Sequence, residues 1–392
     1  MAVPLQSDVP TFVAPAHTRL DYVPGRLVVA VHESVDEPFE YLQREAGAHT
    51  LESVDTGVTI VGLDERALSP ELLRTVESSR AVAFAERMPA RWLSVAPGAP
   101  DPRHNRQWGL RAIRWFDADV SDCDRVTVAV CDTGVDRDHP DLKGAIASYD
   151  HEGTSATDVI GHGTHVSGIA AARADDTAGV AGVAPCRIAM WKVFPDEPLQ
   201  GSFYVDGTRF LRVLGAVAGS GAKVLNLSLG GTQSSRAEQL LFDRLEQAGV
   251  TVVAAMGNEF QHGNPVEYPA AYDHVLAVGA CSETNRRSAF SNTGRHIGLA
   301  APGSNILSTL PTKPSDYRPD TDYASWSGTS MATPQVAAAV ALVSATHSEW
   351  TPADVKKHLR DRAAKVAELR GKDFSEEYGS GVLDIAALLA AD

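Results

Sequence analysis

The sequence predicts an α/β protein with a mostly parallel sheet and helices on both faces, preceded by a small α+β domain. Three observations in the 392 residues predict this architecture. After residue 108, short apolar segments alternate with helical stretches, as in parallel sheets with helical crossovers. Residues 25–87 have the order strand, helix, strand, strand, helix, strand, which is a common α+β unit. Residues 88–107 hold four prolines without periodicity, which is typical of a linker.

The N-terminal part divides into a lead-in and the small domain. Residues 1–24 are rich in proline and aperiodic, so we expect an irregular segment. Within residues 25–87, apolar runs predict strands and amphipathic spacing predicts helices, the second opened by Ser69 as N-cap. The expected strands are residues 27–31, 50–54, 58–63 and 82–85, and the expected helices are residues 37–46 and 70–78.

Residues 108–390 form the larger domain. The expected strands are residues 126–130, 187–193, 224–229, 250–255 and 275–278. Helices are expected to follow His162, Tyr204, Ala237 and Thr329, with a last helix over residues 352–369. Because parallel sheets bind ligands at the carboxyl ends of their strands, functional residues are expected there.

Charge and cysteine content exclude several classes of partner. The chain has 35 Lys and Arg against 50 Asp and Glu, a net charge of −15. Nucleic acids and anionic membranes require a basic face, so neither is an expected partner. No apolar run reaches the roughly 18–20 residues of a membrane helix. The four cysteines form no C-x-x-C pair, and the first residues lack a basic and then apolar leader. We therefore expect a cytoplasmic protein, with export and removal of a signal as the alternative.

Three motifs occupy positions suited to chemistry. Asp132-Thr-Gly follows a predicted strand, Gly161-His162-Gly opens a helix, and Gly328-Thr-Ser330 opens a second, apolar helix. Nucleophilic acyl chemistry needs a hydroxyl, an imidazole that takes its proton and a carboxylate that orients the imidazole. Ser330, His162 and Asp132 supply one of each.

Each motif alone has a simpler interpretation. Asp-Thr-Gly after a strand is usually a turn, and a serine before an apolar helix is usually an N-cap. His162 and His165 have the spacing of a metal pair but lack the H-E-x-x-H pattern. A second Asp-Thr-Gly at Asp55 raises the alternative of an aspartic protease, although Asp55 falls in a predicted hairpin turn. The combined order Asp, His, Ser favours the nucleophilic interpretation.

Residues 104–390 resemble the subtilisin-like serine proteases, or subtilases, because the segments around these three residues match that family's blocks. Further matching segments are Val224-Leu-Asn-Leu-Ser-Leu-Gly-Gly231, Ala254-Ala-Met-Gly-Asn258-Glu259, Tyr268-Pro269-Ala270 and Tyr378-Gly-Ser-Gly-Val-Leu-Asp384. The resemblance implies a serine endopeptidase that acts through an acyl-enzyme. Ser330 would attack the carbonyl, His162 would act as general base and then acid, and Asp132 would orient His162.

The resemblance also implies which residues hold the substrate. Asn258 and the Ser330 amide would bind the oxyanion. Ser228, Leu229 and Gly230 would pair with the peptide as an added strand. Gly257 would line the specificity pocket.

Two glutamates predict the specificity. In the family, the residue before Tyr-Pro lies at the base of the main pocket and the residue after the oxyanion asparagine lies at its rim; here these are Glu267 and Glu259. A carboxylate there favours a cationic substrate, so we expect Arg or Lys on the acyl side of the cut bond. The processing site is expected from Arg91 to Arg103. Alternatively, Glu267 turns to solvent and the pocket takes apolar residues.

Structural calcium is a further implication of the resemblance, whereas catalysis needs no cofactor. Carboxylates and carbonyl oxygens suit Ca²⁺. The candidate ligands are Asp141, Asp176 and the carbonyls of Ala174, Ala178 and Val180. The alternative is that the acidic residues only solvate a loop.

The small domain resembles the propeptide that chaperones and then inhibits these proteases. This implies a monomeric, self-processing zymogen with its processing site in residues 88–107, whose partners are peptide or protein substrates and its own propeptide. Two alternatives stay open: an unrelated partner domain, and a latent or permanently inhibited subtilase that serves as a binding scaffold.

Overall fold

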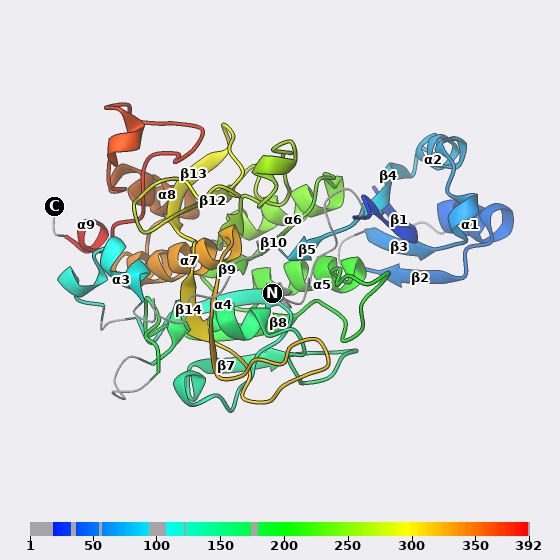
Figure 1. Cartoon of the computed structure of the whole chain (residues 1–392). Helices are drawn as coiled ribbons and strands as arrows, with labels where there is room; N and C mark the ends of the chain where they lie inside the picture. The colour runs from blue at the N-terminus through cyan, green and yellow to red at the C-terminus, as the bar shows by residue number, and fades with distance from the viewer. Residues whose placement is uncertain are drawn as a thin grey trace, which may run out of the picture.

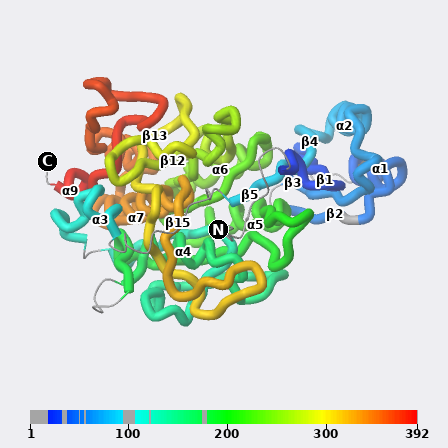
Figure 2. Tube along the Cα trace, in the orientation of Figure 1, coloured from blue at the N-terminus to red at the C-terminus, as the bar shows by residue number. Residues whose placement is uncertain are grey.

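The computed structural model describes residues 19–32, 37–54, 57–93, 107–120, 123–173 and 179–390. A small domain, blue in Figure 1, projects from one end of a large α/β body. The C-terminus lies at the opposite end of that body (Figure 2). The two parts expected from the sequence are therefore distinct in space.

The small domain is a four-stranded antiparallel sheet of order β2-β3-β1-β4. Its elements are β1 (Tyr22–Val31), α1 (Glu37–Ala46), β2 (Thr50–Ser53), β3 (Val58–Gly62), α2 (Pro70–Glu77) and β4 (Val82–Pro89). Alternate residues of β1 face opposite sides: Leu27 and Val29 pack in the helical core, whereas Val28 and Ala30 join a core shared with the large body. The sheet is therefore buried on both faces, because the large body covers the second one.

The boundaries of the small domain differ from those expected. Tyr22 pairs with Pro89, so the end of the expected lead-in and the start of the expected linker are strand. A further strand, β5 (Trp92–Leu93), pairs with β10 (Leu229–Gly230) of the large body. Sequence periodicity missed the start of β1, the end of β4 and the whole of β5, because their hydrogen-bond partners lie far away in the chain.

The large body contains a seven-stranded parallel sheet of order β13-β12-β11-β9-β6-β8-β7. Its strands are β6 (Thr127–Asp132), β7 (Ile146–Asp150), β8 (Arg187–Lys192), β9 (Val224–Leu227), β11 (Thr251–Ala255), β12 (Val275–Cys281) and β13 (Ile297–Pro302). The antiparallel pair β14 (Ile306–Thr309) and β15 (Tyr323–Trp326) lies outside it. The expected parallel sheet is confirmed.

Helices cover both faces of this sheet, as expected (Figure 1). The helices of the large body are α3 (Trp108–Ala112), α4 (His162–Ala171), α5 (Gly207–Gly219), α6 (Arg236–Gln247), α7 (Thr329–Thr346), α8 (Pro352–Asp361) and α9 (Ile385–Leu389). Val128 and Val130 of β6 pack in the core that contains α4 and α7, whereas Ala129 and Cys131 pack in the core that contains α5 and α6.

Several elements depart from the sequence expectation. Strands β7, β13, β14 and β15 were not expected. The predicted strand over residues 224–229 is divided at Ser228, because the chain leaves β9 there to pair with β5. The predicted last helix ends at Asp361, after which Ala364 pairs with Val382. Each departure is fixed by a distant partner.

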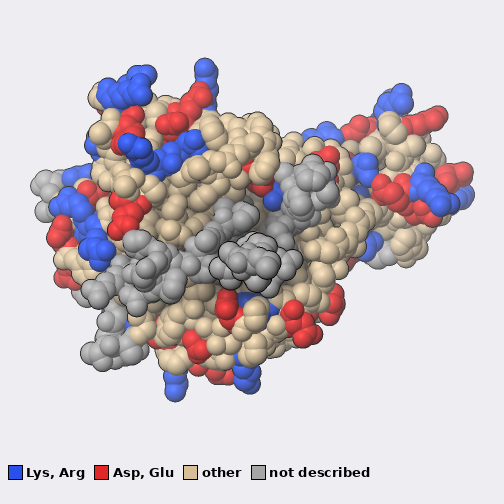
Figure 3. All heavy atoms as spheres, in the orientation of Figure 1, with Lys and Arg blue, Asp and Glu red and all other residues tan. Residues whose placement is uncertain are grey.

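The visible surface carries charges of both signs. Figure 3 shows Lys and Arg interspersed with Asp and Glu on the small domain and at the opposite end of the large body. Within the described residues, no helix combines the length and apolar character needed to cross a membrane.

Candidate active site

The predicted catalytic residues meet at the carboxyl edge of the sheet. Asp132 is the last residue of β6, and β9 beside it leads into Ser228. His162 is the first residue of α4, and Ser330 is the second residue of α7. Parallel strands and helix N-termini share this edge, so the fold brings together residues almost 200 positions apart (330 − 132 = 198).

The side chains of His162 and Asp132 are in direct contact in the interior of the protein. His162 Nδ1 lies 2.7 Å from Asp132 Oδ1, and both side chains are fully buried. The Thr133 amide also donates to Oδ1, at 2.7 Å. His162 Nε2 is buried and has no hydrogen-bond partner among the described residues. That nitrogen is therefore available to take a proton.

A second carboxylate, which the sequence did not single out, ties the two loops together. Asp158 accepts hydrogen bonds from the Thr133 hydroxyl (2.8 Å), the Gly161 amide (2.8 Å) and both the amide and hydroxyl of Thr164. Thr133 follows Asp132, and Gly161 precedes His162. Asp158 therefore fixes the spacing of the Asp132–His162 pair.

Ser330 is held close to the strand predicted to bind substrate. Its hydroxyl donates to the Ser228 carbonyl at 2.8 Å, and the Ser228 hydroxyl donates to the Ser330 carbonyl at 3.0 Å. Its position in the first turn of α7 favours negative charge near its backbone amide.

The side-chain amide of Asn258 lies beside the start of α7, next to the residue that precedes Ser330. Its Oδ1 accepts from the Thr329 amide (2.9 Å) and hydroxyl (3.1 Å). The Thr329 hydroxyl in turn accepts from the Gly257 amide at 3.2 Å. Because its oxygen is engaged, Nδ2 is the free end of the side chain, and it is buried without a partner among the described residues. This orphaned donor suits an oxyanion.

The strand expected to bind peptide already pairs with a segment of the same chain. Leu93 faces Leu229 and Trp92 faces Gly230 in an antiparallel register. On the other side, Trp92 bridges to Tyr204, and the Val205 amide donates to the Arg91 carbonyl at 2.9 Å. Segment 91–93 thus lies between two extended segments of the large body, as an added strand would.

Glu267 and Glu259 lie together beside Gly257. A Cβ at Gly257, whose φ is +99°, would be 2.2 Å from Glu267 Oε1. Glu267 is 1% exposed, and its Oε2 has no partner among the described residues. Arg19 Nη1 contacts Glu259 Oε1 at 2.5 Å. Burial, followed by the charge of Glu259, raises the pKa of Glu267 to about 8.

The candidate calcium ligands are described only in part, since Ala174, Asp176 and Ala178 lie outside the described residues. Asp141 is buried and accepts hydrogen bonds from the Val180 amide (2.8 Å) and the Tyr323 hydroxyl (3.1 Å). Across the described parts of the chain, no three His, Cys, Asp or Glu residues are placed to hold a metal. The buried carboxylate of Asp141, which contacts Val180 just after the residues outside the description, offers the hard oxygen donors that calcium prefers.

The second histidine has a structural environment. His165 Nε2 lies 3.0 Å from the Ala324 carbonyl, and its ring stacks on Trp326 with centroids 4.8 Å apart. Burial lowers the pKa of His165 to about 3. Asp55 and Thr56 of the second Asp-Thr-Gly segment lie outside the described residues.

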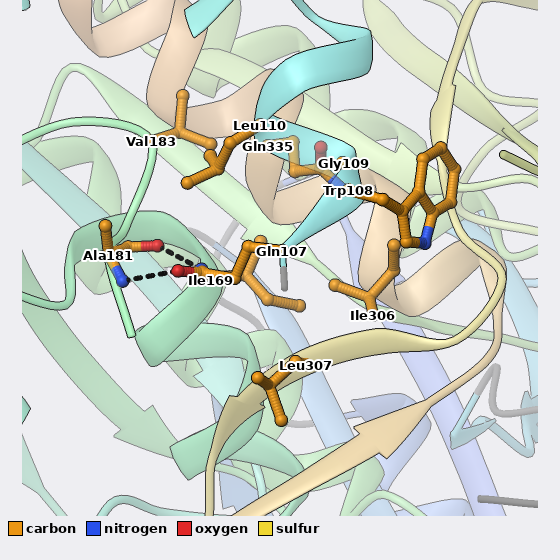
Figure 4. Close-up of a pocket in the computed structure, with 10 residues that line it drawn as sticks. All are labelled: Gln107, Trp108, Gly109, Leu110, Ile169, Ala181, Val183, Ile306, Leu307 and Gln335. Carbon is orange, nitrogen blue, oxygen red and sulfur yellow. Dashed lines mark hydrogen bonds between the residues drawn. The ribbon is translucent and has the colours of Figure 1, made fainter. Parts of the chain in front are cut away.

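A separate cavity beneath α3 is too small for a peptide. Its volume is about 20 Å³, room for roughly one water molecule. Figure 4 shows Gln107 closing one side through two hydrogen bonds to Ala181, with Gln335 from α7 at the back. None of the predicted site residues lines this cavity, so it is not part of the candidate site.

Comparison with known proteins identifies a serine endopeptidase. The sequence model of the Subtilase family matches residues 124–381, and the chain belongs to this family. It is 37% identical over 268 residues to subtilisin of Bacillus pumilus, covering 67% of this chain and 90% of that protein. It is 33% identical to an alkaline protease of Shouchella clausii, covering 82% of this chain and 77% of that protein.

A solved structure agrees with these sequence matches. Fervidolysin from Fervidobacterium pennivorans, described as a keratinolytic enzyme related to subtilisin, superposes with a TM-score of 0.78 at 26% identity. The superposition covers 94% of this chain but 61% of the fervidolysin chain. The predicted subtilisin-like fold is confirmed.

The expected cytoplasmic location is wrong. The relatives are subtilisins, alkaline proteases and fervidolysin, and this kinship favours secretion. The expectation rested on the missing leader pattern and, to a lesser extent, on four cysteines without a paired motif, and the cysteines do not report the compartment. All four cysteines are free and buried, and such residues serve as small apolar side chains in any compartment.

Proposed function

We propose that this subtilase hydrolyses peptide bonds through Asp132, His162 and Ser330 and is made as a self-processing zymogen. The observation that carries the proposal is the meeting of four features at one edge of the sheet. These are the 2.7 Å Asp132–His162 contact, Ser330 at the start of α7, and two buried nitrogens, His162 Nε2 and Asn258 Nδ2, that have no hydrogen-bond partner within the described ranges.

Acylation follows from this geometry. The Ser330 hydroxyl turns from the Ser228 carbonyl towards His162 Nε2, gives it the proton, and attacks the substrate carbonyl carbon. Asn258 Nδ2 and the Ser330 amide donate to the oxyanion, and Asp132 stabilises the imidazolium. His162 then gives its proton to the departing amine. The C–N bond breaks, and an ester to Ser330 remains.

Deacylation repeats these steps with water. His162 takes a proton from the water, whose oxygen attacks the ester carbonyl, and then returns the proton to Ser330 as the acid product leaves. No step requires a cofactor.

The small domain is proposed to keep the enzyme latent. Strand β5, which directly follows the small domain, pairs with β10 and so occupies the edge that is predicted to bind substrate. In the small domain, Glu86 accepts hydrogen bonds from the Ser235 hydroxyl (2.6 Å) and the Arg236 amide (3.0 Å) at the start of α6. Arg236 also contacts Glu77 at 2.6 Å. Arg91 is a poor candidate for the cut site, because its carbonyl oxygen accepts a hydrogen bond from the Val205 amide. We therefore expect processing in residues 94–106, where Arg103 is the basic residue predicted from the sequence.

Self-processing is tested with the full chain. We expect mass spectrometry to find a cut in residues 94–106 of the wild-type protein, and Ser330→Ala to stay intact when pure. A fluorophosphonate should label Ser330. Cleavage of pure Ser330→Ala at the same bond would contradict self-processing. A wild-type chain that stays intact and unlabelled would favour the binding scaffold instead.

The acidic pocket supports a preference for Arg or Lys on the acyl side of the cut bond. Arg19 already brings a guanidinium to Glu259, and Glu267 lies beside it. Profiling with a mixed peptide library tests this preference. We expect faster cleavage after Arg than after Leu, with the difference reduced in Glu267→Ala. Equal or better cleavage after Leu or Phe, unchanged in Glu267→Ala, would contradict it.

A further inference from the structure

Arg91 occupies a second acidic pocket, separate from the one formed by Glu259 and Glu267. Arg91 is 1% exposed, and its Nη2 lies 2.7 Å from Glu238 Oε2. The same nitrogen is 3.4 Å from the Tyr272 hydroxyl, and Nη1 donates to the Ala90 carbonyl at 3.1 Å. The guanidinium is thus held by a carboxylate, a hydroxyl and a backbone oxygen, which is an arginine geometry rather than a lysine one.

The carboxylate of this pocket belongs to the protease part of the chain. Glu238 lies in the first turn of α6 and is 3% exposed. The Tyr272 hydroxyl, the other side-chain group that contacts Arg91, accepts a hydrogen bond from the Ser235 amide. Arg91 comes from outside the segment that matches the Subtilase family. When segment 90–93 leaves, Glu238 loses this counter-charge. A largely buried carboxylate without a cation is unfavourable, so the vacated pocket favours another cation.

The register of β5 relates this pocket to the reacting bond. Leu93 faces Leu229, and the residue before Leu229 is Ser228, whose carbonyl holds the Ser330 hydroxyl. In a substrate strand with this register, the residue that lies opposite Ser228 has its carbonyl group next to the Ser330 hydroxyl. The substrate residue in the Glu238 pocket then lies three positions earlier, as Arg91 does relative to position 94. Close approach is possible because Gly231 lacks a side chain: a Cβ there would be 2.3 Å from the Ala90 carbonyl.

We propose that Glu238 and Tyr272 form a second cation-binding subsite, which selects arginine three residues before the residue whose carbonyl Ser330 attacks. This inference rests on the proposed endopeptidase function and deepens it. Together with the first acidic pocket, it describes an enzyme for substrates with two basic residues separated by two others. The segment at 90–93 occupies the subsite in the way a substrate would.

The test compares matched peptides with the full-length protein after its own processing. Quenched fluorescent peptides differ only at the residue that lies three positions before the residue with the attacked carbonyl, that is, at the fourth residue before the cut bond. This residue is Arg, Lys or Gln. We expect kcat/KM for Arg to exceed that for Gln by roughly ten- to a hundredfold, the range for a hydrogen bond to a charged group, with Lys between them. In Glu238→Gln, the Arg-to-Gln ratio should fall to within about twofold of one.

Two further variants guard against a folding defect. Asp243→Asn alters a half-buried carboxylate on the same helix, whose partners are Gln239 and His274, and should keep the wild-type ratio. The double variant Arg91→Met/Glu238→Leu replaces the buried pair by apolar groups of similar size and should also bring the Arg-to-Gln ratio of kcat/KM close to one. Active enzyme is counted in each preparation by fluorophosphonate labelling.

The outcomes separate the two proposals. Labelled wild-type enzyme that cleaves the Arg and Gln peptides equally would overturn the second subsite and leave the endopeptidase proposal standing. An unchanged Arg preference in both Glu238 variants would also overturn it. Protein that is neither labelled nor active would overturn the endopeptidase proposal and this inference with it.

Discussion

Asn258 illustrates how a single side chain is prepared for the reaction at the residue scale. Thr329 holds its oxygen through two hydrogen bonds, which leaves Nδ2 as a buried donor that has no partner in the part of the chain that the structure describes. An orphaned buried donor costs stability in the resting protein. That cost is understandable if the donor is satisfied only when an oxyanion forms.

We therefore predict that Asn258→Ala lowers kcat by about 10²–10³ with little change in KM, the size known for loss of this donor in subtilisins. The reason is that the interaction exists in the transition state and not with the ground-state substrate. Steady-state kinetics on a peptide substrate, normalised by active-site labelling, would check it. A rise in KM at constant kcat would show instead that Asn258 binds substrate.

Glu267 gives a pH prediction at the same scale. Its pKa is raised to about 8, by burial first and then by the charge of Glu259, while Arg19 opposes the shift. The folded protein thus keeps a proton that the unfolded chain releases. The free energy of unfolding should therefore fall as pH rises through the window from about 4.5, the ordinary value, to about 8.

In a Ser330→Ala background, which avoids self-digestion, Glu267→Gln should remove this contribution. The variant should gain stability over its parent progressively between pH 5 and 8, by on the order of a few kcal/mol, and no further above pH 8. Urea unfolding at several pH values would measure the gain. A difference between the two curves that does not change with pH would refute the argument.

At the scale of elements, the start of α6 joins the two domains. Glu86 of β4 accepts hydrogen bonds from the Ser235 hydroxyl and the Arg236 amide, and more weakly from the Ala237 amide at 3.3 Å. The helix N-terminus favours the negative charge of this carboxylate. Because Glu86 comes shortly before β5 in the sequence, this contact helps to hold β5 in place against β10.

We expect Glu86→Ala to weaken this association by about 1–2 kcal/mol, the value of a helix cap. In the full chain, peptidase activity should then appear sooner after refolding than in the wild type. Glu71→Ala, an exposed glutamate in the first turn of α2, is the matched control and should leave the lag unchanged. Equal lags in all three proteins would exclude a role for Glu86 in latency.

At the scale of the whole molecule, the proposed calcium gives a test that needs no substrate. If Asp141 and the loop before Val180 hold the ion, binding to the folded state alone stabilises it by mass action. EDTA should lower the melting temperature of the Ser330→Ala chain by several degrees, and added Ca²⁺, but not Mg²⁺, should restore it. Asp141→Asn should abolish the difference. An EDTA-insensitive melting temperature would contradict the site.

The sequence by itself determined the fold class and brought the catalytic candidates into view. Apolar strands alternating with helices define a parallel sheet through local pattern, and Asp132, His162 and Ser330 sit in short motifs with helix starts that are also local. The same holds for the order of elements in the small domain, which the structure reproduces. All of these features can be predicted from residues that are close to one another in the sequence.

Tertiary structure alone decided which distant residues meet. The pairing of Arg91 with Glu238 spans 147 positions, and no local pattern encodes it. The same is true of Asp158, which looks like an ordinary loop acid until Thr133 and Gly161 fold around it, and of β5, whose two residues become a strand only against β10. Burial and a specific partner, rather than residue type, give these side chains their chemistry, because both depend on chain segments that come together only in the folded state.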